Sequence, residues 1–413
     1  MKGRTSHHVL IGLLIAIGLL MVLEGLARVL GTVYNDVRAY KVDSSQWLLY
    51  SEKFGWEKRP NFSGLMPNET RTLAPEKYQR QFDEEGFLSV DAEQIRHGRH
   101  RKILAIGDSN TFGWGVPTDM TFVEVLDELL SETDVINLGV TGYSSFQGRK
   151  VLESVFDRFQ PALVIVSFNF NDRRFVTDAA EEDAESKFSR DTLMRNVDGV
   201  RDKIYLYRMI ELAATKLGLG QGVPRGTGGW DVRRMHARVP PAQYRENLER
   251  IARFCQERGV PLVFIVLQDN PVQTAQLRSG VELFRRGELD GAERDFRIVV
   301  RSNGWFTTLG KKYLADLYER QGKAQLAEVV AREGSEILST GDKPIFLDSE
   351  YNEIMRAVGL EYGVSLVEAG EALKSDPSVY VDFCHFDERG HRTTALMLKE
   401  VVEHLLPTPE VSR

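Results

Sequence analysis

Short apolar runs and helical patterns alternate along much of the chain. Short and mainly apolar runs at 103–106, 135–138 and 162–168 are typical of buried parallel strands. Helical spacing of apolar positions separates these runs at 121–130 and 147–159. Because strands alternate with helices, the pattern predicts a doubly wound α/β sheet.

The same alternation returns after residue 240. A helix is expected at 244–258, and Gly259 ends it before another apolar run at 260–267. The patterns at 360–368 and 393–406 complete the alternation. We therefore expect one α/β domain in two parts, 101–275 and 341–413.

A helical pattern without strands fills residues 276–340, between those two parts. It contains an internal repeat with an offset of 35 positions. In this repeat Gly280, Leu283, Gly287, Ala292 and Phe296 correspond to Ala315, Tyr318, Gly322, Ala327 and Ala331. Small residues let paired helices approach closely, and the period is similar to that of the tetratricopeptide repeat. We expect an inserted helical repeat pair that leans on the α/β domain and could bind a protein partner. An ordinary helical hairpin is the alternative.

The N-terminus has a third pattern. Residues 9–23 are continuously apolar or glycine, and extended to Leu30 the run reaches the roughly 20 residues that a bilayer crossing needs. Lys2 and Arg4 precede it, which favours a cytoplasmic N-terminus. The pattern predicts a tail and transmembrane helix at 1–32 and places the rest of the chain outside the cytoplasm, in the periplasm. A cleaved signal peptide is the alternative.

Polar segments flank the predicted domain. Residues 33–100 are polar and mixed in pattern, and we interpret them as a juxtamembrane segment. Residues 177–201 are acidic and polar, and residues 215–230 are rich in glycine. Both are candidates for a rim or lid over the site.

Composition excludes several kinds of partner. The 413 residues carry a net charge of −7 without a basic block, so nucleic acid is not an expected partner. Only Cys255 and Cys384 occur, which rules out a disulfide framework. Metal-ligand spacings such as C-x-x-C or H-E-x-x-H are missing, and we expect neither a metal nor a cofactor.

The chemistry-bearing residues begin with Ser109 in GDSNTFG, at residues 107–113. It follows a predicted strand and precedes a helix, where open α/β folds place their sites. A serine hydroxyl needs a base and a group that orients the base. Asp382 and His385, three residues apart, can supply this pair. Taken alone, Ser109 would instead be read as a helix N-cap.

Donors for an oxyanion are also expected at the same edge of the sheet. The motif NLGVTG (137–142) follows the second strand, and NFND (169–172) follows the third. A glycine amide and an asparagine side chain in these loops can stabilise negative charge on a tetrahedral intermediate. Asp108, Asp172 and His391 are interpreted as structural residues.

With these four blocks in order, the chain resembles the SGNH, or GDSL, hydrolase family over residues 102–270 and 342–406. The resemblance implies a flavodoxin-like three-layer α/β/α sandwich. It implies that Ser109 is the nucleophile, His385 the base and Asp382 its partner. It further implies that the oxyanion hole comprises the backbone of Ser109 and Gly142 and the side chain of Asn171. Asn169 stands where the family usually has glycine.

The leading hypothesis is a membrane-anchored serine esterase that cleaves an acyl or acetyl ester through an acyl-enzyme. Its substrate would be an ester, including acylated carbohydrate or lipid. One alternative is an O-acyltransferase acting on an envelope polysaccharide. Another is a binding or scaffold protein that recognises a partner through its repeat-like helices.

Overall fold

The structure is a computed structural model. It describes residues 12, 15, 18–26, 47–51, 53–65, 79–83, 86, 101–130, 132–176, 231–234, 236–302, 306–332 and 345–407. The segments predicted to form a rim or lid, at 177–201 and 215–230, lie outside these residues.

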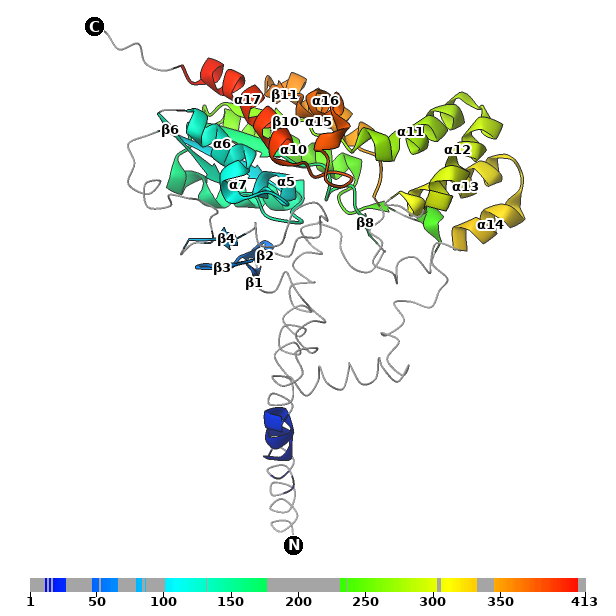
Figure 1. The fold of residues 1–413 in the computed structure, drawn as a ribbon, viewed down its shortest axis with the longest axis horizontal. Coiled ribbons are helices and arrows are strands. Elements are labelled where there is room, and N and C mark those ends of the chain that lie inside the picture. Colours follow the sequence, from blue (N-terminus) through cyan, green and yellow to red (C-terminus); the bar gives the residue numbers. More distant parts are fainter. Residues whose placement is uncertain are drawn as a thin grey trace.

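A five-stranded parallel sheet forms the centre of the α/β domain, as predicted (Figure 1). Its strands are β5 (Arg101–Gly107), β6 (Thr133–Asn137), β7 (Leu163–Ser167), β10 (Leu262–Ile265) and β11 (Ser365–Val367). They are arranged β11-β10-β7-β5-β6. Read from the other edge, this is the 2-1-3-4-5 order of flavodoxin-like sheets.

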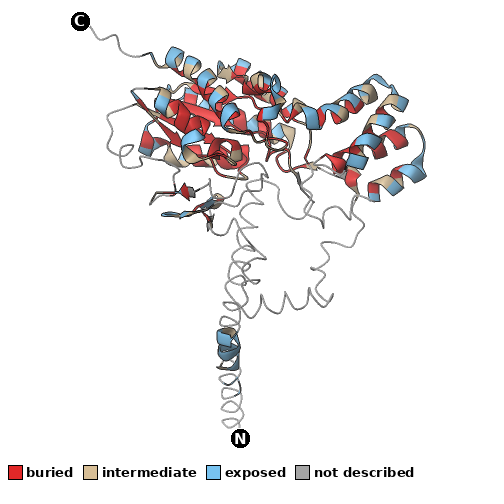
Figure 2. Cartoon of the chain, viewed as in Figure 1, coloured by how far each residue is buried: buried red, intermediate tan, exposed pale blue. Residues whose placement is uncertain are grey.

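Helices cover both faces of the sheet. Alternate residues of β5 point to opposite faces, because side chains of a strand alternate. Ile103 and Ala105 join one apolar cluster, and Leu104 and Ile106 join the other. The first cluster includes α6 (Phe122–Leu129), α16 (Ala369–Lys374) and α17 (Glu388–Leu405). The second includes α7 (Ser145–Phe159), α10 (Pro241–Gln256) and α15 (Ser349–Tyr362). Figure 2 shows the buried residues on the strands of the sheet and on the helix faces that cover it.

Two antiparallel strand pairs occur where the sequence indicated only a polar segment. β1 (Leu48–Ser51) pairs with β2 (Gly55–Lys58), and β3 (Ser63–Leu65) pairs with β4 (Gln79–Gln81). Trp47 and Phe82, at the ends of these pairs, pack with Phe112 in a separate apolar cluster. The segment is therefore attached to the α/β domain just after β5.

Four consecutive helices occupy the region of the predicted insertion. They are α11 (Pro271–Arg286), α12 (Leu289–Ser302), α13 (Thr307–Arg320) and α14 (Ala324–Arg332). The turns within the two pairs contain Gly287 and Gly322, with φ of 81° and 72°. A Cβ on Gly280 would lie 2.7 Å from the Phe296 ring, which explains the small residue there. The tetratricopeptide assignment, the binding role and the limits 276–340 stay predictions.

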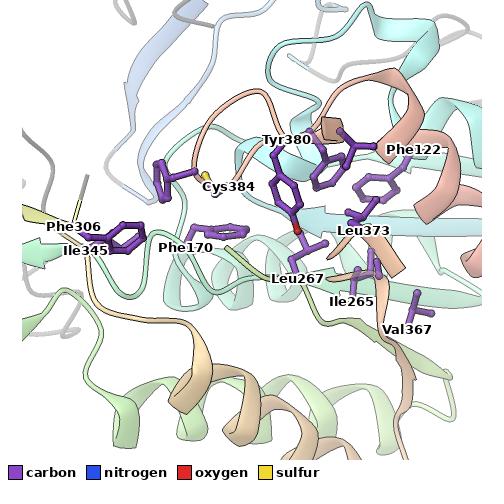
Figure 3. Packing of buried hydrophobic residues seen from close by; sticks show 14 of the residues in the cluster. Phe122, Phe170, Ile265, Leu267, Phe306, Ile345, Val367, Leu373, Tyr380 and Cys384 are labelled. Atoms are coloured by element: carbon purple, nitrogen blue, oxygen red, sulfur yellow. The ribbon is translucent and has the colours of Figure 1, made fainter. Parts of the chain in front are cut away.

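This helical unit, α11 to α14, shares its core with the sheet, as expected of a pair that leans on the α/β domain. Leu277 and Phe306 belong to the same apolar cluster as Ile103 and Ile265. Figure 3 shows Phe306 at the junction, near Phe170 and the loop that carries Cys384.

Smaller elements complete the described chain. These are α5 (Ser109–Phe112), β8 (Phe175–Val176), β9 (His236–Ala237) and the 3-10 turns Thr118–Met120, Val232–Arg234 and Pro377–Val379. β8 and β9 pair with each other antiparallel.

The predicted transmembrane helix at 1–32, and with it a periplasmic catalytic domain, must be corrected. Among the residues that the structure describes, no helix is both long enough and apolar enough to cross a membrane.

Candidate active site

Ser109 is the first residue of α5, immediately after β5. A Cβ on Gly107 would lie 2.7 Å from the Ser167 carbonyl oxygen, so only glycine fits this strand-to-helix turn. Gly113 ends the short helix with φ of 78°. The N–H groups of a first helical turn have no partner within the helix, which leaves the Ser109 amide available to a ligand.

His385 and Asp382 lie beside Ser109, although 276 residues separate His385 from the serine. His385 Nε2 is 2.7 Å from Ser109 Oγ, and His385 Nδ1 is 2.7 Å from Asp382 Oδ2. The three predicted residues therefore form one hydrogen-bonded chain. This is the order in which a carboxylate orients an imidazole toward a hydroxyl.

Asp382 is ionised in this arrangement. Burial raises its pKa, but His385 and the backbone N–H groups of His385 and Cys384 outweigh burial, so that the pKa falls below the usual value. Its Oδ1 accepts from those N–H groups at 2.7 and 2.8 Å. The carboxylate is thus held in place by its own loop while Oδ2 faces the imidazole.

Asn270, between β10 and α11, is hydrogen-bonded to the loop that carries Asp382. Its backbone N–H donates to the Phe383 carbonyl oxygen at 2.8 Å, and its Nδ2 donates to the Asp382 carbonyl oxygen at 3.2 Å. Its Oδ1 accepts from Val272 N–H and caps α11. Sequence patterns gave no signal for this residue.

Gly142 lies in the loop after β6 with φ of 83°, in the left-handed region that favours glycine. The carbonyl before it, of Thr141, accepts from Trp56 Nε1 at 3.0 Å. Its own carbonyl accepts from Arg238 at 2.7 Å. Trp56 and Arg238 were not among the predicted site residues.

Asn171 follows β7 and is buried. Its Nδ2 donates to Asp108 Oδ2 at 3.2 Å. Because an amide nitrogen carries two hydrogens, one remains for a second acceptor. Asp108 links Asn171 to the start of α5, because its Oδ1 accepts from the Asn110 N–H at 2.9 Å.

The other polar residues of these motifs have structural contacts. Asn169, at the position where the resemblance expects glycine, donates from Nδ2 to Asn352 of α15. Asp172 accepts from the backbone and hydroxyl of Ser145 at 2.9 and 2.6 Å. His391 Nδ1 accepts from Phe122 N–H at 3.1 Å, within the core. These contacts agree with the structural interpretation of Asp172 and His391.

Trp114 stands beside the imidazole. The centroids of the Trp114 and His385 rings are 6.5 Å apart, and the backbone N–H of Trp114 donates to the Ser109 carbonyl oxygen at 2.8 Å. The half-buried indole thus adds an apolar side chain next to the serine.

Asp382, Cys384 and His385 form a group, within the described chain, whose potential metal-ligand atoms lie within 4.8 Å of one another. Burial raises the pKa of the Cys384 thiol well above its usual range, which keeps it protonated. A metal binds the thiolate, and His385 already bridges Asp382 and Ser109. The arrangement suits proton transfer better than metal binding.

The structure thus combines a parallel sheet in flavodoxin-like order with serine, histidine and aspartate side chains that are hydrogen-bonded to one another at its carboxyl edge. The GDSL-like lipase/acylhydrolase family matches residues 105–393. The chain belongs to this family and is a hydrolase that acts on ester bonds.

Solved structures resemble the chain at low sequence identity. The lipase/acylhydrolase from Enterococcus faecalis is 14% identical, with 74% of this chain and 96% of that chain covered and a TM-score of 0.37. The esterase EstA from Pseudoalteromonas sp. is 11% identical, with 75% and 100% covered and a TM-score of 0.34. The SGNH-hydrolase family esterase AlinE4 is 17% identical, with 75% and 99% covered and a TM-score of 0.33. A search of the curated proteins gives no match.

Proposed function

We propose that the protein is a serine esterase that cleaves an acyl ester through an acyl-enzyme on Ser109. The observation that carries this proposal is the chain of two 2.7 Å contacts from Asp382 through His385 to Ser109 Oγ. A base in contact with a hydroxyl can remove its proton as the oxygen attacks.

In the first half of the reaction, Ser109 Oγ attacks the carbonyl carbon of the ester and its proton passes to His385 Nε2. Asp382 stabilises the imidazolium through Nδ1–H. When the tetrahedral intermediate collapses, the bond to the alcohol oxygen breaks and His385 returns the proton to the leaving alcohol. In the second half, His385 takes a proton from water, the hydroxide oxygen attacks the acyl carbon, and Ser109 Oγ leaves with that proton.

Negative charge on the carbonyl oxygen needs fixed donors. We assign this role to the backbone N–H groups of Ser109 and Gly142 and to Nδ2 of Asn171. Support comes from their positions, after β5, β6 and β7, at one edge of the sheet. The contact between Asn171 and Asp108 supports the assignment too, because it fixes one amide hydrogen and directs the other.

Labelling with a fluorophosphonate, followed by peptide mass spectrometry, tests the nucleophile. We expect modification at Ser109, and loss of both labelling and acetyl-ester turnover in Ser109→Ala. Ser154→Ala, which removes a hydroxyl from the half-buried side of α7, is the matched control and should retain both. Modification at another serine, or full turnover by Ser109→Ala, would refute the proposal.

The reaction products identify the molecule that accepts the acyl group. Water gives a free acid, whereas a carbohydrate hydroxyl that attacks the same acyl-enzyme would give an acylated sugar. We propose water as the acceptor. Incubation with a chromogenic acetyl ester and an oligosaccharide should therefore yield acetate, and stoichiometric acetylation of the sugar would establish transfer instead.

A further inference from the structure

The peptide unit between Thr141 and Gly142 is held on one side by an indole. Trp56 Nε1 donates to the Thr141 carbonyl oxygen at 3.0 Å. This carbonyl and the Gly142 N–H belong to one planar trans peptide and point in opposite directions. A hydrogen bond that fixes the carbonyl therefore also fixes the direction of the Gly142 N–H.

A second side chain holds the next peptide. Arg238 donates to the Gly142 carbonyl oxygen at 2.7 Å and to Gln147 Oε1 at 3.0 Å. Its guanidinium also lies 5.4 Å from the centroid of the Trp56 ring, within the range of a cation–π contact. The two peptide planes that flank Gly142 are thus held by adjacent groups.

The indole is itself anchored. The Tyr143 hydroxyl donates to the Trp56 carbonyl oxygen, and the two rings meet edge to face at a centroid distance of 5.6 Å. Gln147 Nε2 donates to the Phe54 carbonyl oxygen at 2.7 Å. A Cβ on Gly142 would lie 3.3 Å from Trp56 Cζ2, which places the indole directly against this glycine. The β1–β2 pair is therefore tied to the start of α7 and to the Gly142 loop.

We propose that Trp56 is a positioning residue that aims the Gly142 N–H at the oxyanion, and that the β1–β2 pair is part of the catalytic unit. This rests on the proposed esterase function and on Gly142 as a donor. Trp56 lies before the family-matched residues 105–393, so the support comes from the N-terminal part of the chain.

Trp56→Phe tests the proposal, because phenylalanine retains an aromatic ring but cannot donate to Thr141. Loss of an entire oxyanion donor lowers kcat by about 10²–10³-fold, and a donor that is present but misdirected should cost about tenfold. We expect kcat on an acetyl ester to fall by about that factor while KM changes less than about threefold. Tyr362→Phe is the control, since Tyr362 ends α15 and lies outside the β1–β2 pair and the Gly142 loop. It should retain kcat.

A boronic acid inhibitor separates positioning from folding, because it forms a tetrahedral adduct whose oxygen occupies the oxyanion site. Its inhibition constant should weaken in Trp56→Phe by about the same factor as kcat/KM. Unchanged kcat and boronate affinity would overturn the proposal. The proposal would also be overturned if kcat fell, KM rose by a similar factor and the thermal midpoint dropped as well, because these changes together indicate a structural role. A wild-type protein without ester turnover or Ser109 labelling would instead refute the esterase function itself.

Discussion

At the scale of single residues, Asp108 connects the start of α5, which carries Ser109, to Asn171. Burial raises the pKa of Asp108 to about 6, although the Asn110 N–H and His385 act to lower it. The carboxyl is therefore ionised at neutral pH, and it offers the Asn171 amide an acceptor at 3.2 Å. This hydrogen bond orients the Asn171 side chain.

Asp108→Asn retains the shape of the side chain but replaces one acceptor oxygen by an NH₂ donor. If the new carbonyl oxygen accepts from Asn110, the new amide meets the Asn171 amide donor against donor. We expect kcat to fall about tenfold, less than the loss of a complete oxyanion donor. Steady-state kinetics on a chromogenic ester measures this, with the exposed Asp157→Asn on α7 as the control. Equal kcat in both variants would contradict the role of Asp108.

His391 is a buried imidazole whose pKa affects the stability of the fold. Burial, followed by Arg80 and His385, lowers the pKa of His391 to about 3. In the unfolded chain a histidine titrates near 6.5. Because the unfolded state binds the proton first as pH falls, stability from this group is present above about pH 6.5 and is lost toward pH 3.

His391→Gln removes that titration and retains an oxygen that can accept from the Phe122 N–H. We expect the variant to be less stable than the wild type at pH 7. Its thermal midpoint should nevertheless decline less between pH 7 and pH 5. Thermal unfolding at pH 7, 6 and 5 measures the two declines. Parallel declines would show that His391 does not titrate on unfolding.

At the scale of elements, Asn270 joins the end of β10, the start of α11 and the Asp382 loop. Asn270→Asp retains an oxygen to cap α11 but places a carboxylate against the Asp382 carbonyl oxygen. We expect the thermal midpoint to change by only about a few degrees, because the cap, worth about 1 kcal/mol, remains. The loop should shift, and kcat/KM should fall severalfold. Unchanged kcat/KM would show that Asp382 needs no support from α11.

Elements that are stabilised locally were predicted well. Strands β5, β6 and β7 lie within about two residues of the predicted runs, since burial on both faces favours a mainly apolar sequence. Helix α17 begins five residues before the predicted 393, because Asp387 caps it by accepting from Arg389 and Gly390 N–H. Ser109, Asp382 and His385 could be identified because each stands in a short motif.

Elements that are stabilised by remote contacts were not predicted. The β1–β2 pair depends on bonds such as Trp56 to Thr141, 85 residues apart. Arg238 likewise donates to a carbonyl 96 residues away. A side chain that binds a distant backbone group produces no periodicity or spacing in the sequence, so the sequence does not predict the roles of Trp56 and Arg238.

At the scale of the whole molecule, the helical unit and the α/β domain share one apolar core. Phe306, at the start of α13, meets Phe383 edge to face at a centroid distance of 6.3 Å. Phe383 lies beside Asp382 and also meets Phe170, the neighbour of Asn171, at 6.5 Å. The aromatic contacts therefore run from the helical unit to both sides of the candidate site.

This continuity predicts that the helical unit and the α/β domain unfold together. Phe306→Ala removes a buried ring and should cost about 3–5 kcal/mol. It should lower the midpoint of a single calorimetric transition by about 5 °C or more. Ester turnover should be lost along that same transition, because the ring supports the Asp382 loop through Phe383. Ile298→Ala, on the exposed side of α12, is the control and should shift the midpoint by at most about 1 °C. Two separate transitions, with turnover following only the upper one, would show that the helical unit folds independently of the catalytic core.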